Sequence, residues 1–202
     1  MNDLHKMGWI TKNFENLKGL LLLPFGIYFL FLATWNYLQL GITETGKDIG
    51  FPSLMIILTI LATILIDHYY AITMGRVKST SNLKIILIII FMFIMFFIVD
   101  YLDMMMNSQL KQPVSFTSIA WASLFAYIFF SRKQTVYIIF SVALFLLAFF
   151  PTIGLIPYKM IFNDLYGVWG YLLIGLAMIV GGLVDHYTLK KLLPINQDVK
   201  DE

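Results

Sequence analysis

The 202-residue chain contains no cysteine, and charged residues make up only 13% of it. The absence of cysteine excludes disulfides, thiolate metal sites and cysteine nucleophiles. Charge is scarce compared with the roughly 25% of an average soluble domain. The formal net charge is +2, so no basic face is large enough to bind nucleic acid. The sequence also lacks nucleotide-binding loops, zincin motifs and glycine-rich phosphate-binding loops, and it therefore gives no positive sign of an enzyme.

Hydrophobic residues are abundant instead and account for 59% of the chain. They occur in runs of about 16 to 24 residues, the length that a helix needs to cross a hydrocarbon core of roughly 30 Å. The runs are continuous, whereas the strands of a membrane barrel alternate between apolar and polar residues. The sequence therefore predicts an all-α integral membrane protein.

The apolar runs predict a bundle of six transmembrane helices, joined as three helical hairpins. The predicted spans cover about residues 17–40, 52–74, 83–106, 114–130, 135–150 and 166–189. Together they form a membrane domain over residues 17–191. Residues 1–16 are expected to be an interfacial segment on the membrane surface, and residues 192–202 a cytoplasmic tail.

The distribution of Lys and Arg predicts the orientation of this bundle. Eleven of them lie before the first span or after the second, fourth and sixth spans, and three lie in the opposite loops. Because cytoplasmic loops are enriched in Lys and Arg, both termini are expected in the cytoplasm of a multi-pass cell-membrane protein.

One short phrase occurs twice. Asp67-His68-Tyr69 lies near the end of the second predicted span, and Asp185-His186-Tyr187 lies near the end of the sixth, 118 positions later. The first and third hairpins are therefore expected to form a weak internal repeat. Repeats of the same orientation are related by an axis along the membrane normal, which would place the two histidines at one depth.

The repeated phrase has two interpretations. If the two helices pack side by side, His68, His186, Asp67 and Asp185 could bind a divalent metal such as zinc, iron or manganese. A haem held by the two histidines is a related possibility. In the structural alternative, each carboxylate lies close to the lipid headgroups and pairs with a nearby Lys or Arg, while the tyrosines belong to the interfacial aromatic belt.

Four basic residues are candidates for docking a soluble partner. Arg76 and Lys78 follow the second span, and Arg132 and Lys133 follow the fourth, all on the predicted cytoplasmic side. A cytoplasmic ATPase or another subunit could bind there.

Two acids stand near the outer end of the third span. Asp100 and Asp103 are one helical turn apart, and we expect them to lie where this span meets water. Met104, Met105 and Met106 follow. A Cu(I) site is the alternative to a purely structural role for these methionines.

In size, six-span topology and lack of soluble domains, the chain resembles the membrane subunits or small accessory proteins of bacterial ABC-type exporters. ECF-type substrate-binding subunits have a similar length and span count. These resemblances imply a transport-related protein of the bacterial inner membrane that works with a cytoplasmic ATPase or other membrane subunits. The alternatives are a metal- or haem-binding redox protein and a membrane sensor, regulatory or immunity protein.

Overall fold

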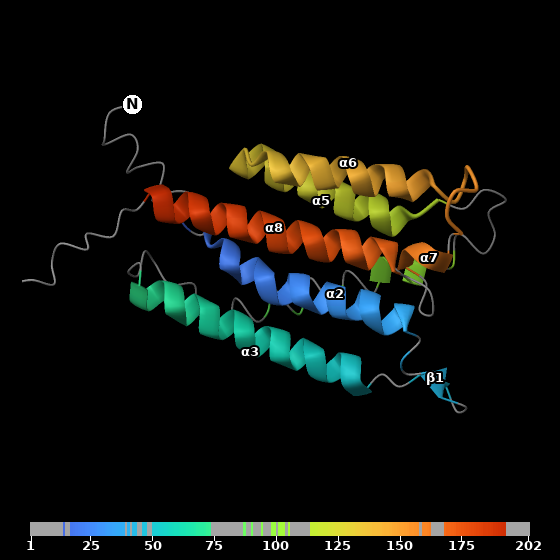
Figure 1. The fold of residues 1–202 in the computed structure, drawn as a ribbon, viewed down its shortest axis with the longest axis horizontal. Helices are drawn as coiled ribbons and strands as arrows, with labels where there is room; N and C mark the ends of the chain where they lie inside the picture. The colour runs from blue at the N-terminus through green and yellow to red at the C-terminus, as the bar shows by residue number, and fades with distance from the viewer. Residues whose placement is uncertain are drawn as a thin grey trace, which may run out of the picture.

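The computed structural model describes most of the apolar part of the chain (Figure 1). The described residues are 14, 17–38, 40, 42–43, 46–47, 50–73, 87, 90, 94, 98–99, 101–103, 105, 114–157, 159–162 and 168–192. Most of the predicted N-terminal segment, most of the predicted span 83–106 and the tail beyond residue 192 lie outside them.

The described residues are almost entirely helical. The helices are η1 (Gly19–Leu22), α2 (Leu23–Tyr37), α3 (Gly50–Thr73), α5 (Phe116–Arg132), α6 (Thr135–Phe149), α7 (Lys159–Phe162) and α8 (Trp169–Leu192). Within the described ranges, the strands are two-residue β1 (Ile42–Thr43) and β2 (Gly46–Lys47), which pair antiparallel between α2 and α3.

Among the described residues, three helical segments are long and apolar enough to cross a membrane, judged by length and composition. They are Gly19–Tyr37, Gly50–Thr73 and Trp169–Leu192, and Thr135–Phe149 is apolar but shorter. The helical class of the predicted fold is therefore confirmed, with three candidate membrane helices. The six-span count, the hairpin arrangement and the internal repeat remain predictions.

Glycines bring α2 and α8 together as an antiparallel pair (Figure 1). A Cβ added to Gly26 would lie 2.9 Å from the carbonyl oxygen of Gly175, and one added to Gly175 would lie 2.9 Å from that of Gly26. Seven residues earlier in the chain than Gly26, Gly19 of η1 approaches Gly182 of α8 in the same manner. The two backbones are in contact because small residues allow membrane helices to pack this closely.

The first turn of α5 is capped by an acid from another segment. Asp103 accepts hydrogen bonds from the backbone N–H groups of Phe116 at 2.9 Å and Thr117 at 3.1 Å, and from the Ser115 hydroxyl at 3.2 Å. These N–H groups have no partner within their own helix and carry partial positive charge. Asp103 is 1% exposed, so the prediction that it meets water is wrong. Asp100 lies outside the described residues.

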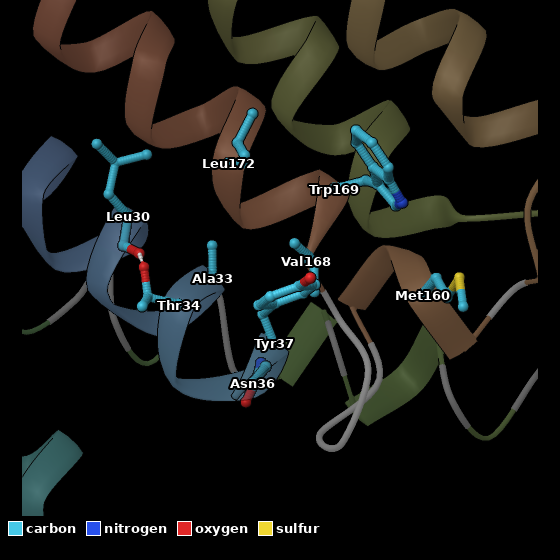
Figure 2. Close-up of a pocket in the computed structure, with 9 residues that line it drawn as sticks. All are labelled: Leu30, Ala33, Thr34, Asn36, Tyr37, Met160, Val168, Trp169 and Leu172. Atoms are coloured by element: carbon cyan, nitrogen blue, oxygen red, sulfur yellow. Dashed lines mark hydrogen bonds between the residues drawn. The ribbon is translucent and has the colours of Figure 1, made fainter. Parts of the chain in front are cut away.

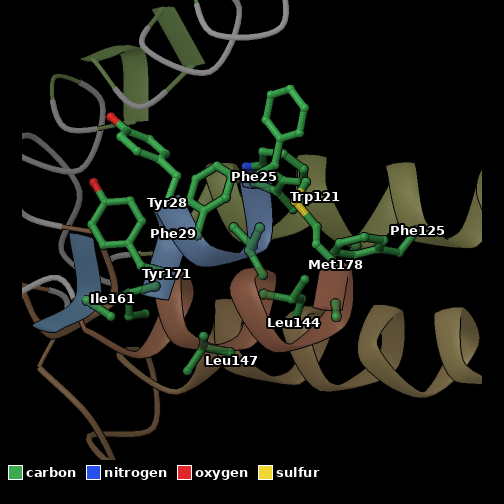
Figure 3. Close-up of a cluster of buried hydrophobic side chains, with 14 of the residues drawn as sticks. Phe25, Tyr28, Phe29, Trp121, Phe125, Leu144, Leu147, Ile161, Tyr171 and Met178 are labelled. Atoms are coloured by element: carbon green, nitrogen blue, oxygen red, sulfur yellow. The ribbon is translucent and has the colours of Figure 1, made fainter. Parts of the chain in front are cut away.

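Aromatic rings fill the centre of the bundle between α2, α5, α6 and α8 (Figure 3). Phe29 stacks on Tyr171 with ring centroids 6.2 Å apart and meets the edge of Trp121 at 5.5 Å. Phe125 stacks on Tyr137 at 6.2 Å. The contact of Phe125 with Tyr137 holds α5 against α6, and the contact of Phe29 with Trp121 joins α5 to the α2–α8 pair.

Helix α3 is attached more loosely than the other long helices. Its buried residues form a single stripe of Thr59, Thr63, Asp67 and Tyr70. Each threonine hydroxyl donates to a carbonyl four residues earlier, which satisfies it within the helix. The remaining members of the stripe, Asp67 and Tyr70, make the polar contacts to other elements that are described next.

Candidate functional site

Asp185, near the end of α8, lies at the centre of a buried polar cluster. It is 0% exposed, and its Oδ2 forms an ion pair with the Arg132 guanidinium. The Tyr137 hydroxyl donates to the same oxygen at 2.5 Å, and Arg132 also donates to that hydroxyl at 3.2 Å. The other oxygen, Oδ1, is buried and has no hydrogen-bond partner among the described residues. Side chains from α5, α6 and α8 thus meet at one carboxylate.

The local sequence explains how Arg132 and Tyr137 reach Asp185. Arg132 is the last residue of α5, and only two residues separate it from α6, so Tyr137 in the first turn of α6 lies at the same end of the bundle. Gly181 lies one turn before Asp185. A Cβ at Gly181 would come within 2.5 Å of the Tyr137 ring. The glycine therefore leaves the space that this ring occupies.

A second buried ion pair holds the other repeated phrase. Lys18 Nζ lies 3.0 Å from Asp67 Oδ1, and the two side chains are only 6% and 10% exposed. Lys18 immediately precedes η1, whereas Asp67 lies in the last third of α3. The pair joins the start of the first apolar segment to the end of the second.

Tyr70 connects the two phrases. Its hydroxyl accepts a hydrogen bond from the backbone N–H of Leu20 at 3.2 Å and lies 2.8 Å from Nδ1 of His186. A hydroxyl that accepts from Leu20 can donate its own proton to Nδ1, which would leave His186 protonated on Nε2. Tyr70 of α3 is thereby joined directly to α8 and also to η1.

The seven residues that make these contacts are called the polar network below. They are Lys18, Asp67, Tyr70, Arg132, Tyr137, Asp185 and His186. Both phrases contribute to it, because η1 passes between them: a Cβ added to Gly19 would touch Asp185 and His186. The two halves are not equivalent, however, because each aspartate has a different base and only one histidine takes part.

The two histidines of the predicted metal site have different surroundings. His68 is exposed, whereas His186 bonds Tyr70. No group of three or more His, Asp or Glu side chains that could hold a metal ion is found in the part of the chain that the structure describes. Binding of a divalent metal or haem stays a prediction. The observed contacts share one feature with the structural alternative, since each carboxylate pairs with a base, but the bases are Lys18 and Arg132 and not the basic residues that follow each phrase in the sequence.

The predicted docking residues divide into three groups. Arg76 and Lys78 lie outside the described residues. Lys133 is exposed in a left-handed backbone conformation with φ 59°, and its Nζ lies over the Phe130 ring at 5.6 Å. The Arg132 guanidinium points into the bundle and pairs with Asp185. Of the described candidates, Lys133 is therefore the one that faces outward.

A cavity of about 720 Å³ opens at the opposite end of the α2–α8 pair (Figure 2). Its walls come from the last two turns of α2, the first turn of α8 and Met160 of α7. Most of the lining is apolar, and Tyr37 and Trp169 are exposed. The bundle thus has a polar network at one end and a hollow at the other.

Several network residues carried no signal in the sequence that would identify their partners. Lys18 contributed only to the orientation count, and Tyr137 lies in an apolar run without a recognisable motif. Lys18 is 49 residues from Asp67, and Arg132 is 53 residues from Asp185. Such distant pairings depend on helix packing.

Comparison of the chain with protein-family models, curated proteins and solved structures finds no match.

Proposed function

We propose that this protein is the membrane subunit of a multicomponent transporter in the bacterial inner membrane, with both termini in the cytoplasm. One observation carries the proposal: buried charges close one end of the helix bundle, and a largely apolar cavity opens at the other. This asymmetry suits a protein that receives a ligand at one membrane surface and responds to a partner at the other.

The closed end consists of contacts that can break and reform. An ionisable side chain within a membrane helix is costly unless it is paired, and such residues commonly mark functional positions. Here the ion pairs and the Tyr70–His186 hydrogen bond connect separate elements: η1 with α3, α3 with α8, and the α5–α6 hairpin with α8. Polar contacts of this kind are often exchanged when packed helices shift between two states.

The open end offers a place for a small ligand. Ligand pockets in proteins usually measure about 300 to 1,000 Å³ and are mainly apolar with a few polar groups. The cavity between α2, α7 and α8 has this size and composition.

The proposal includes a partner because the sequence has no nucleotide-binding motif of its own. A cytoplasmic ATPase would supply the energy. By the positive-inside rule the network end faces the cytoplasm, and exposed Lys133, Lys190 and Lys191 lie at this end. With Arg76 and Lys78 they would form a basic surface for the partner.

The test is purification from the native membrane in mild detergent, with co-purifying proteins identified by mass spectrometry. We expect an ATPase in stoichiometric amount, and we expect Arg76→Glu with Lys78→Glu to release it. Lys47→Glu with Lys111→Glu is the matched control, because it changes the charge equally in loops predicted on the opposite surface. Transport by the purified protein alone in vesicles would refute the proposal. Metal analysis and an absorption spectrum of the same sample test the metal- and haem-binding alternative.

A further inference from the structure

We propose that the cavity between the end of α2 and the start of α8 binds an uncharged, largely apolar molecule that carries a hydrogen-bonding group at one end. This inference deepens the proposed transport function, on which it rests, by naming the class of ligand that the subunit would take.

The cavity forms where the glycine contact between α2 and α8 ends. Gly26 and Gly175 bring the two backbones into contact. One heptad further, at the positions that would continue this contact, the chain has Ala33 in α2 and Val168 just before α8. Both residues line the cavity. Their larger side chains exclude the close approach that glycine allows, so the helices separate here and leave a hollow.

The lining decides the charge of the ligand. None of the described residues that line the cavity is charged. A charged group that entered would lose its hydration and find no opposite charge among the described lining residues, at a large cost in free energy. Leu30, Ala33, Val168 and Leu172 offer apolar contact instead (Figure 2). The ligand should therefore be neutral, with an apolar body.

The rim provides the polar contacts. Tyr37 is 72% exposed and Trp169 is 46% exposed, and both line the cavity. Such residues gather where a membrane meets water, because their rings are apolar and their tips form hydrogen bonds. The Thr34 hydroxyl already donates to the Leu30 carbonyl at 2.9 Å. The hydrogen-bonding end of the ligand is thus expected at Tyr37 and Trp169, at the level of the lipid headgroups.

The size of the cavity limits the ligand to a small molecule or to one chain of a lipid. A volume of about 720 Å³ falls within the range of small-molecule pockets. An uncharged molecule dissolved in the membrane and the apolar chain of a bilayer lipid share the required chemistry, and the experiment has to separate these two sources.

The test uses two photoreactive probes with the same diazirine-bearing alkyl chain, one a long-chain alcohol and the other the corresponding carboxylate. Each is added to the full-length protein in lipid nanodiscs, and labelled peptides are mapped by mass spectrometry. We expect the alcohol to label residues 30–37 and 168–172 in a saturable manner and the carboxylate to label them much less. Labelling of Val142, which is exposed on α6, should not saturate with either probe.

Filling the cavity should abolish the saturable labelling. Val168→Phe places a ring in the hollow, and Val142→Phe is the matched control on an exposed surface. Leu172→Trp, with exposed Leu146→Trp as its control, provides a second pair in case the first variant does not fold. Equal labelling by alcohol and carboxylate, labelling that does not saturate, or labelling that survives both cavity-filling variants would overturn the inference.

Competition identifies the source of the ligand. Loss of labelling with excess unlabelled alcohol at constant lipid supports a free neutral molecule, and loss on raising the phospholipid content supports a lipid chain. Because the labelling requires neither an ATPase nor transport, its failure is distinguishable from failure of the proposed function. An ATPase that co-purifies with a protein that does not label would refute the ligand inference alone.

Discussion

Removal of Arg132 should destabilise the protein more than removal of the charge on its partner Asp185. Asp185 is 0% exposed, and in Arg132→Met its carboxylate would keep, among the described residues, only the Tyr137 hydroxyl as a hydrogen-bond donor. Breaking a buried ion pair in this way costs about 3 to 5 kcal/mol, because an unpaired charge remains buried. We expect a loss of this size in the free energy of unfolding.

The reverse substitution should cost less because Arg132 is closer to water. Its side chain is 17% exposed, and a long basic side chain can turn its charged end toward the surface. In Asp185→Asn the amide keeps the shape of the carboxylate, so the cost should be about 1 to 3 kcal/mol, the penalty for an imperfectly satisfied buried polar group.

The double variant Arg132→Met with Asp185→Leu separates two quantities: the net contribution of the ion pair to stability and the cost of leaving one charge buried without its partner. Because apolar residues often replace a buried ion pair with little loss, the double variant should be more stable than Arg132→Met alone. Lys191→Met is the matched control for the loss of one positive charge, because Lys191 is exposed at the same end of the bundle.

Unfolding of the detergent-solubilised variants, followed by thermal scans and by steric trapping in bicelles, would measure these differences. The reasoning fails if Arg132→Met is no less stable than Lys191→Met. It also fails if the double variant is less stable than Arg132→Met.

Three other predictions concern single positions. Gly181→Leu should lower the midpoint of thermal unfolding more than Leu176→Ala does. The added side chain at position 181 would overlap the Tyr137 ring, whereas Leu176 is 37% exposed. Equal shifts of the midpoint would contradict this. In Tyr70→Phe, the backbone N–H of Leu20 loses the hydroxyl that accepts its hydrogen bond, which should lower the free energy of unfolding by about 1 to 3 kcal/mol. The same change at exposed Tyr69 should have almost no effect. Asp103→Ala should cost about 0.5 to 2 kcal/mol through loss of a helix cap, measured as faster hydrogen exchange in the first turn of α5; unchanged exchange there would argue against the cap.

Three of the described apolar helices begin and end within about three residues of predicted spans, whereas their crossing of a membrane stays a prediction. The predicted spans 52–74 and 166–189 correspond to Gly50–Thr73 and Trp169–Leu192, and the predicted span 135–150 corresponds to Thr135–Phe149. The length of an apolar run and the thickness of a bilayer are enough for this prediction, because each helix satisfies its own backbone hydrogen bonds.

The case of Asp103 shows where this reasoning fails. From its place at the end of an apolar run, the acid was expected to meet water, yet it is buried and caps a helix that begins thirteen residues later at Phe116. The sequence of one apolar run does not show where the next helix will lie in space.

The sequence by itself determined that this chain forms long apolar helices and that one polar phrase is repeated near the ends of two of them. Only the tertiary structure decided what that phrase does: Asp67 pairs with Lys18, Asp185 pairs with Arg132, and His186 bonds Tyr70. The physical reason is that helix formation depends on neighbouring residues and the solvent around them. The choice of a partner for a buried charge depends on which helices pack together, and here glycine contacts place α8 against η1 and α2.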